Sequence, residues 1–272
     1  MAFNKSSKRR RLYRSTCIMR GEIMATTSSK LIERVKTGIP GLDGILHGGF
    51  IRGTNIVISG GVGTGKSIFS MQFLVAGAEK YNESGVLVTL EEKPAELRRE
   101  SAQFGWNLEQ LENEKKLIII DAASSKAGLP SSEEWALRRG FDLNTLAQEI
   151  YKATKTIAAQ RIAVDSLSGL GLRIESSAEV RGSIFKLSAL LRELGVTSIM
   201  TSEILSNSPG LSRYGVEEFV AQGLIILSLE EEQSELRRSM VIRKMRATAH
   251  SLKRFPFEIS TKGIVVMPSG EM

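Results

Sequence analysis

Residues 58–69, ISGGVGTGKSIF, decide the fold of this chain. They contain the spacing Gly-x-x-x-x-Gly-Lys-Ser from Gly60 to Ser67, directly after an apolar run. Glycines allow the backbone to turn sharply and to approach phosphates closely, so that its N–H groups can surround the anion. A helix that begins at such a loop adds a favourable dipole. The stretch therefore predicts a strand, a phosphate-binding loop and a helix that together bind a nucleoside triphosphate.

The residues of this loop have separate predicted tasks. Lys66 can reach the β- and γ-phosphates of the nucleotide, and the Ser67 hydroxyl can ligate Mg²⁺. Close backbone approach is assigned to the four glycines of the loop, Gly60, Gly61, Gly63 and Gly65. The loop predicts binding of the triphosphate with Mg²⁺, but it does not say whether the protein hydrolyses it.

Strand and helix patterns alternate from about residue 33 onward. Strands are predicted at residues 54–59, 86–90, 116–122, 161–166 and 196–202, and helices at residues 65–80, 94–104, 143–158 and 178–194. Short strands then follow one another at residues 219–229, 240–246, 255–259 and 264–267. This order predicts an α/β fold with a mostly parallel sheet, helices on both faces and added C-terminal antiparallel strands. Because no linker or internal repeat is visible, residues 33–272 are predicted to form one domain.

Charge is distributed unevenly along the chain. The 272 residues carry a net charge of +7, and residues 1–30 contain eight Lys or Arg residues against the single acid Glu22. The rest of the chain is therefore neutral on balance, which argues against nucleic-acid binding by the domain. Residues 1–30 lack hydrophobic periodicity and are predicted to be a disordered basic tail that could contact nucleic acid or anionic lipid.

Cysteine content and hydropathy predict a location for the protein. Cys17 is the only cysteine, so no disulfide can form within the chain. No apolar run reaches the roughly 18 residues needed to span a bilayer, and no apolar stretch follows the basic N-terminus as in a secretory signal. These features predict a protein of the reducing cytoplasm without a membrane span.

Acidic residues stand at the ends of predicted strands, where ligands bind in open α/β sheets. Asp165 in RIAVDS is the predicted Mg²⁺-side aspartate, and it is preferred to Asp121 in LIIIDA because its strand comes later in the chain. Glu91 and Glu92 in VTLEEKP follow another strand. Hydrolysis needs a carboxylate that orients or deprotonates water. One of these two glutamates is the predicted catalytic residue, with two solvated loop charges as the alternative, and the residues alone do not choose between them.

Two cations occur far along the chain, in VIRKMRATAH. Lys244 and Arg246 are two residues apart, so on a strand they point to the same face. One interpretation is a solvated strand face. The other is a pair of cations aimed at a phosphate, supplied by a neighbouring chain if the protein forms a ring.

Several stretches together resemble the KaiC family, the RecA-like ATPases related to the circadian clock protein. They are TGIPGLDGILHGGFIRGTNIVISGGVGTGKSIFSMQFL, LVTLEEKPAELRRESAQFGWNLEQL, FDLNTL, RIAVDSLSGL, SRYGVEEFVAQGLIIL and VIRKMRATAHSLKRFPFEI, and they cover the chain in order from about residue 35 to about residue 270. The resemblance implies a RecA-like P-loop NTPase fold for residues 33–272. It also implies ATP and Mg²⁺ bound at the subunit interfaces of a hexameric ring.

The resemblance implies roles for individual residues as well. Glu91 falls on the catalytic glutamate of the family and Glu92 on its partner. The phosphate-binding positions are Gly63, Thr64, Gly65, Lys66, Ser67 and Ile68, with Ser67 as the Mg²⁺ ligand where threonine is usual. The segment that a neighbouring subunit places around ATP contains Lys244, Met245, Arg246, Thr248 and His250, with Lys244 and Arg246 as its catalytic cations.

The chain departs from the family at several points. Ala247 replaces a usual glycine, and Gln103 stands where a small hydroxyl residue is familiar, which affects the expected adenine and ribose contacts. The clock protein has two copies of the domain and this chain has one, without the adjacent Ser/Thr pair of the autophosphorylating copy. A clock role is therefore not implied. Autokinase activity is not expected, although Ser206, Ser208 and Ser212 lie nearby.

Three functions are compatible with these residues. The leading hypothesis is a Mg²⁺-dependent ATPase that works as a homo-oligomeric regulatory or assembly module with an unknown protein partner. A RecA/RadA-like DNA-handling ATPase would share the fold, but residues 204–217, ILSNSPGLSRYGVE, offer one arginine for phosphate contacts. The third hypothesis is an ATP-dependent binding switch that does not hydrolyse, against which the intact pair Glu91 and Glu92 argues.

Overall fold

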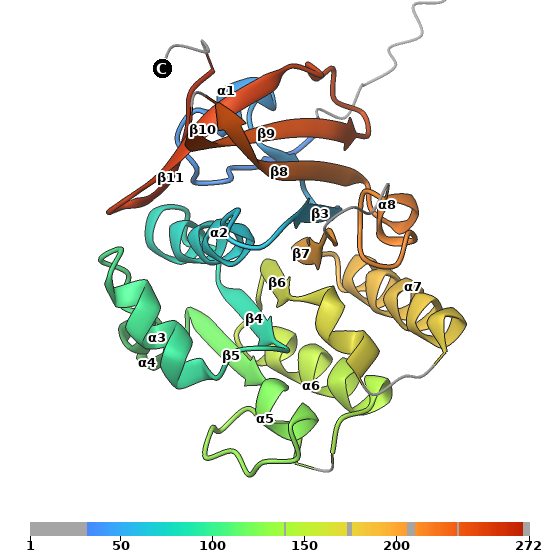
Figure 1. Cartoon of the computed structure of the whole chain (residues 1–272). Coiled ribbons are helices and arrows are strands. Elements are labelled where there is room, and N and C mark those ends of the chain that lie inside the picture. Colours follow the sequence, from blue (N-terminus) through green and yellow to red (C-terminus); the bar gives the residue numbers. More distant parts are fainter. Residues whose placement is uncertain (1–31, 139, 173–175, 206–209, 233, 269–272) are drawn as a thin grey trace, which may run out of the picture. The chain divides into compact units, whose positions relative to one another are not determined.

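One sheet of nine strands organises the protein (Figure 1). The strands are β3 (Asn55–Gly60), β4 (Gly85–Thr89), β5 (Leu117–Asp121), β6 (Arg161–Asp165), β7 (Thr197–Glu203), β8 (Gly223–Glu232), β9 (Glu235–Met245), β10 (Arg254–Ser260) and β11 (Gly263–Val266). Their order is β11-β10-β9-β8-β3-β7-β6-β4-β5. The strands from β8 to β5 are parallel, and β9, β10 and β11 extend the sheet in antiparallel fashion. The predicted α/β architecture is confirmed.

The described part of the chain has defined limits. The computed structural model describes residues 32–138, 140–172, 176–205, 210–232 and 234–268. The basic tail predicted for residues 1–30 lies outside them, as do Ser206 and Ser208. Of the helices in these ranges, none is long and apolar enough to cross a membrane.

Helices cover both faces of the sheet, as the sequence predicts (Figure 1). The long ones are α2 (Lys66–Lys80), α3 (Pro94–Ala102), α6 (Leu143–Thr156) and α7 (Ser177–Glu193). Neighbouring strand residues belong to opposite layers, since Ile56 and Ile58 pack in the core with α2 and Val57 packs with α6 and α7. Successive side chains of a strand point to opposite faces, so one apolar run supplies both cores.

Buried polar contacts of Arg161 connect β6 to α2 and to Glu83, which follows that helix. Arg161 is fully buried, and its Nε donates to Glu83 Oε2 at 2.8 Å while its Nη1 donates to the Phe73 carbonyl at 2.7 Å. Gly77 of α2 makes room for this side chain, because a Cβ there would lie 2.5 Å from the Arg161 Cδ atom. A buried charge needs such partners, so the helix and the strand are fixed relative to each other.

Several short elements were not predicted from the sequence. They are α1 (Leu42–Ile45), α4 (Leu108–Asn113), α5 (Ala123–Lys126), α8 (Glu217–Val220), the 3-10 helix η1 (Leu167–Leu172) and the strand pair β1 (Arg34–Val35) with β2 (Phe50–Ile51). Elements of this length contain too few residues to show a hydrophobic period. Local chemistry forms them instead, as at α4, where the Asn107 side chain accepts a hydrogen bond from the Gln110 N–H.

The boundaries of two predicted strands are wrong. The strand predicted at residues 219–229 begins only at Gly223, because Phe219 lies in α8. The buried Glu217 carboxylate accepts N–H bonds from Tyr214 and Val216 and stabilises a turn and this helix in place of an extended chain. The strand predicted at residues 240–246 runs from Glu235 to Met245, so Arg246 lies beyond β9 and does not share a strand face with Lys244.

Candidate nucleotide site

The predicted phosphate-binding loop connects β3, in the middle of the sheet, to α2. Gly63 and Gly65 adopt φ values of 75° and 97°, the left-handed region that favours glycine. A Cβ at Gly60 would lie 2.6 Å from the Leu227 carbonyl oxygen. The loop is further held by Thr64, whose Oγ1 donates to the Gly61 carbonyl at 2.9 Å. The backbone path therefore requires Gly60, Gly63 and Gly65, whereas a Cβ at Gly61 would meet no atom within 4 Å.

The Lys66 side chain contacts this loop and experiences the charges of nearby carboxylates. Its Nζ donates to the Gly61 carbonyl at 2.8 Å. Burial lowers the pKa of Lys66, and the negative charges of Glu203, Asp165 and Glu91 act in the opposite direction. The charges of three acids at three different strand ends thus act on one ammonium group, next to backbone that can bind phosphate.

Two of the predicted acids are positioned by hydroxyl groups. Asp165 ends β6 and accepts a hydrogen bond from Thr201 Oγ1, and the peptide bond that follows it is cis. Glu91 follows β4, the neighbour of β6, and its Oε1 accepts a hydrogen bond from Ser166 Oγ at 2.6 Å. The ends of β4 and β6 therefore bring Asp165 and Glu91 to the same edge of the sheet.

Asp121, the rejected candidate, has a different environment. It ends β5, the outermost strand, and its carboxylate accepts hydrogen bonds from the Ser124 N–H at 2.9 Å and from Ser131 Oγ at 2.5 Å. These bonds begin α5 and hold the following loop. Asp121 is thus engaged in local structure at the outermost strand, whereas Asp165 ends a strand inside the sheet.

Glu92 has the most perturbed carboxylate of the site. Its Oε2 is buried and has no hydrogen-bond partner among the residues that the structure describes. Burial raises the pKa of Glu92 to about 7, with further contributions from Glu100, Asp165, Glu96 and Glu91. The residues alone did not distinguish the roles of Glu91 and Glu92, but the two side chains have different environments. Glu91 is exposed and held by a hydroxyl, whereas Glu92 is half-buried and close to other acids.

The donor set suits Mg²⁺ together with a bound phosphate. Ser67 stands in the first turn of α2, and Asp165 supplies a carboxylate at the same edge of the sheet. Oxygen donors of this kind fit a hard cation that keeps several waters and shares phosphate oxygens. Within the described ranges, no group of three His, Cys, Asp or Glu side chains could hold a metal without help. The residues therefore fit Mg²⁺ that arrives with a nucleotide.

Arg238 is a cation that the sequence analysis missed. It lies on β9 opposite Leu229 of β8, and its Nε and Nη2 donate to the Gly63 carbonyl at 3.4 and 3.3 Å. This places a guanidinium of the same chain over the phosphate loop. Its only sequence signal is a run of basic residues, since the register of β8 with β9 decides which of them reaches the loop.

The predicted segment Lys244 to His250 lies at the opposite edge of the sheet. Met245 pairs with Gly223, and Gly223 pairs with Ile56 near the start of β3, while the phosphate loop follows Gly60 at its end. The Arg246 N–H donates to the Gln222 carbonyl, level with Asn55. Five residues of strand therefore separate Arg246 from Gly60, about 17 Å along the sheet. One chain does not bring this segment to its own loop.

Within its own chain, this segment makes local contacts. Lys244 Nζ donates to the carbonyls of Glu218 and Ala221, both at 2.7 Å, and burial lowers its pKa. Thr248 Oγ1 accepts a hydrogen bond from Arg34, and His250 Nδ1 lies 3.0 Å from the Thr248 carbonyl. The Met245 side chain is buried, whereas Arg246 is exposed. Arg246 is thus the predicted cation that projects into solvent.

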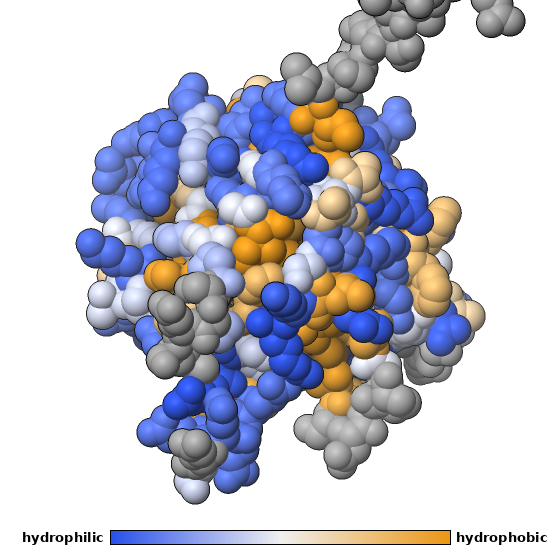
Figure 2. Space-filling view, turned by 90° about the horizontal axis from the view of Figure 1, so that it is seen from above, coloured by the Kyte–Doolittle hydropathy of each residue, from blue (hydrophilic) through white to orange (hydrophobic). Residues whose placement is uncertain are grey.

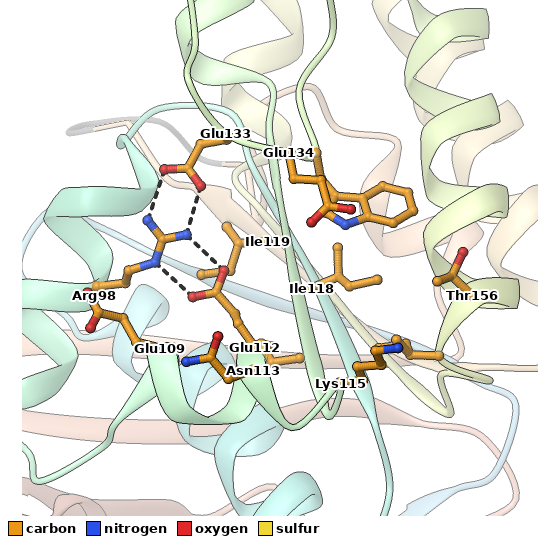
Figure 3. Close-up of a pocket in the computed structure, with 13 residues that line it drawn as sticks. Arg98, Glu109, Glu112, Asn113, Lys115, Ile118, Ile119, Glu133, Glu134 and Thr156 are labelled. Carbon is orange, nitrogen blue, oxygen red and sulfur yellow. Dashed lines mark hydrogen bonds and ion pairs between the residues drawn. The ribbon is translucent and has the colours of Figure 1, made fainter.

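Two cavities differ in their relation to the loop. One adjoins it and is lined by Ser67, Ile68, Met71, Leu97, Glu100, Ser101, Phe104 and Trp106. Its walls are largely apolar, and its volume of about 40 Å³ is too small for a nucleotide base. The other follows the outer edge of β5, where Arg98 lies between Glu112 and Glu133 (Figure 3). None of the predicted site residues lines this second cavity, so it is separate from the nucleotide site.

Comparisons with known proteins agree with this geometry. Residues 35–271 match the family described as ATPase: KaiC. A UPF0273 protein of Thermotoga maritima is 42% identical over 240 residues, which cover 88% of this chain and 98% of that protein. The circadian clock oscillator protein KaiC of Prochlorococcus marinus is 39% identical over 246 residues, 90% of this chain and 48% of that protein. The chain thus spans about half the length of the clock relatives that it matches.

A solved structure leads to the same conclusion. The KaiC-like protein of Pyrococcus horikoshii superimposes with a TM-score of 0.77 at 44% identity, and the match covers 88% of this chain and all of that one. The phosphate loop, the acids at the ends of β4 and β6 and the antiparallel extension all fall within the matched region. The chain belongs to the KaiC family of ATPases and has its RecA-like P-loop fold.

Proposed function

We propose that this protein binds ATP with Mg²⁺ and hydrolyses it as a head-to-tail oligomer that serves as a regulatory or assembly module. The observation that carries the proposal is the arrangement around Lys66. A lysine beside a phosphate-binding loop lies at one edge of the sheet, where the charges of Asp165 and Glu91 act on it. This is the set of charges that phosphoryl transfer to water needs, namely a cation for the phosphates and carboxylates for the metal and the water.

Each residue has a part in the proposed reaction. Lys66 binds the phosphates, and Ser67 and Asp165 hold the Mg²⁺ side of the nucleotide. Glu91, fixed by Ser166 at 2.6 Å, orients the attacking water and accepts its proton. Mg²⁺, when bound, would offset the negative charge of the phosphates. Arg238 adds a second cation of the same chain above the loop.

The other half of the site is proposed to come from a neighbouring chain. Arg246 and the phosphate loop lie at opposite edges of the sheet, so a contact between them joins unlike surfaces of two copies. Such a heterologous contact closes into a ring when its rotation permits. The hexamer implied by family resemblance would satisfy this requirement, with Lys244, Met245, Arg246, Thr248 and His250 facing the next ATP.

Exposed apolar side chains support this assembly. Val62, at the tip of the phosphate loop, is 81% exposed, and Phe219 of α8, the helix whose carbonyls hold Lys244, is 73% exposed. Leu252, two residues after His250, is 65% exposed. Exposed apolar side chains therefore occur at both halves of the proposed interface. Figure 2 shows patches of apolar surface among polar side chains on the face that it displays. The protein partner and the cytoplasmic location stay predictions.

Replacing Glu91 tests the proposed chemistry. In Glu91→Gln, hydrolysis should fall by about 10²- to 10⁴-fold because the group that accepts the proton is lost. Binding of Mg-ATP should persist, since the loop and Lys66 are unchanged. Phosphate release measures turnover and calorimetry measures binding. The matched control is Glu109→Gln on the exposed side of α4, which should leave both unchanged. Full turnover in Glu91→Gln would show that the catalytic assignment is wrong.

A further inference from the structure

The ends of β3 and β7 carry a charged link for which the reaction itself has no use. We propose that Glu203 and Arg213 couple the binding of a nucleoside triphosphate at the phosphate loop to the position of α8 and Lys244. Through them, the nucleotide would control the surface that meets the next copy. The inference rests on the proposed function, because it requires a nucleotide at the loop.

Glu203 stands between two cations. It ends β7 directly beside Gly60, with which it is paired in the sheet, and it is the first of the three acids whose charge acts on Lys66. Its Oε2 also lies 3.5 Å from Arg213 Nη1, and both side chains are one-third exposed. The charge of one carboxylate thus acts on the lysine of the phosphate loop and pairs with a cation outside the loop.

Residues 211–216 are attached to the ends of the central strands. Ser59 of β3 donates its hydroxyl proton to the Leu211 carbonyl at 2.6 Å. Ser202 of β7 accepts a hydrogen bond from the Arg213 N–H at 3.1 Å. The Tyr214 hydroxyl donates to the Ser168 carbonyl, which belongs to η1 after β6. This segment therefore touches the ends of β3 and β7 and the residues that follow Asp165.

Glu217 connects the same segment to α8. It is fully buried, and its carboxylate accepts hydrogen bonds from Ser202 Oγ at 2.9 Å and from Ser212 Oγ at 2.8 Å. The carbonyls of Glu218 and Ala221, in α8 and at its end, accept both hydrogen bonds of Lys244. A displacement of residues 211–216 would therefore be transmitted to α8 and Lys244 through buried, directional contacts.

The charge of the nucleotide provides the driving force. When a triphosphate occupies the loop, Lys66 turns from the Gly61 carbonyl to the phosphates, and Glu203 then faces added negative charge. Arg213 becomes its principal compensating cation, so the pair with its present distance of 3.5 Å should tighten and draw residues 211–216 along. A diphosphate places less charge at the far end of Lys66 and should have a smaller effect.

Hydrogen exchange of the full-length chain tests this link. Exchange in residues 211–221 is measured without nucleotide, with Mg-ADP and with the Mg²⁺ complex of a non-hydrolysable ATP analogue. The analogue should slow exchange more than ADP does, by about fivefold or more for a coupling of ordinary size. In Glu203→Gln and Arg213→Gln this difference should shrink to less than about twofold, whereas Arg213→Lys should keep it.

A matched control and a binding measurement separate the outcomes. Glu114→Gln removes a glutamate that pairs with Lys116 at 2.8 Å and is 38% exposed, against 33% for Glu203, and it should behave like the unsubstituted chain. Calorimetry on the same samples shows whether nucleotide binds. A chain that binds no nucleotide contradicts the proposed function as well as the link. Binding without any exchange difference between the analogue and ADP, or the full difference in both Gln variants, contradicts the link alone.

Discussion

The raised pKa of Glu92 makes the stability of the folded protein depend on pH. Because burial raises the pKa of Glu92 to about 7 from 4.5, the unfolded chain ionises this group at lower pH than the folded protein does. Ionisation of Glu92 therefore lowers the free energy of unfolding as pH rises from about 4.5 to about 7. Above that pH the contribution of Glu92 stays constant. The difference between the two pKa values corresponds to at most about 3 kcal/mol of unfolding free energy. Solvent screening reduces this figure because the side chain is half-buried.

Glu92→Gln should therefore stabilise the nucleotide-free protein at alkaline pH. At pH 8 the free energy of unfolding should rise by roughly 1–2 kcal/mol, and at pH 4.5 it should hardly change. Denaturant unfolding at both pH values checks this expectation. Glu109→Gln, on the exposed side of α4, serves as the control. An equal effect of Glu92→Gln at both pH values would mean that the carboxyl group titrates normally.

At the scale of single residues, the sequence predicts what is encoded locally. The glycines, Lys66 and Ser67 are recognisable because one continuous loop contains them. Arg238 was missed because its approach to Gly63 depends on the pairing of β9 with β8. The sequence also could not show that the charge of Glu203 would act on both Lys66 and Arg213, since those residues come from separate parts of the chain.

Two glycines inside helices should respond oppositely to the same substitution. In α7, a Cβ at Gly182 would meet no atom within 4 Å, so Gly182→Ala should stabilise the protein by about 1 kcal/mol through helix propensity. In α2, a Cβ at Gly77 would lie 2.5 Å from Arg161, which Glu83 and the Phe73 carbonyl hold in place. Gly77→Ala should destabilise the protein by roughly 1–3 kcal/mol. Denaturant unfolding compares them, and stabilisation by both would disprove the packing argument.

At the scale of elements, length decides what the sequence can predict. The long helices and buried strands were found within a few residues because their apolar periods extend over several turns or a full strand. The α8 region was assigned to a strand because Phe219 and Val220 continue the apolar run of β8. The deciding interaction, the buried Glu217 carboxylate with the Tyr214 and Val216 N–H groups, is tertiary and leaves no period in the sequence.

At the scale of the whole molecule, the two halves of the proposed site lie at opposite edges of one sheet. The order of strands and the register of β8 and β9 place Arg246 level with the start of β3 and the loop at its end. From the residues alone, the sequence predicted a contribution from a neighbouring chain only on the condition that the protein forms a ring, and family resemblance implied that ring. The topology gives an independent reason for it, because about 17 Å of strand exceeds the reach of an arginine side chain.

Mixing two inactive variants tests this central claim most directly. Lys66→Ala removes the loop half of the site, and Arg246→Gln removes the cation of the other half, for which a loss of about 10³-fold is expected. After subunit exchange in an equal mixture, about a quarter of the interfaces should combine an intact loop with an intact Arg246. ATP hydrolysis should then recover to about that fraction of the unsubstituted rate.

The matched control mixes Lys66→Ala with Arg238→Gln. Both changes damage the loop half of the same chain, so this mixture should not exceed the mean rate of its two components. Phosphate release is measured for the three variants, the two mixtures and the unsubstituted chain. Recovery in the first mixture and none in the control is the result expected of a site built between two chains. If the Lys66→Ala and Arg246→Gln mixture is as inactive as its components, Arg246 does not act on the neighbouring ATP and the head-to-tail site is contradicted.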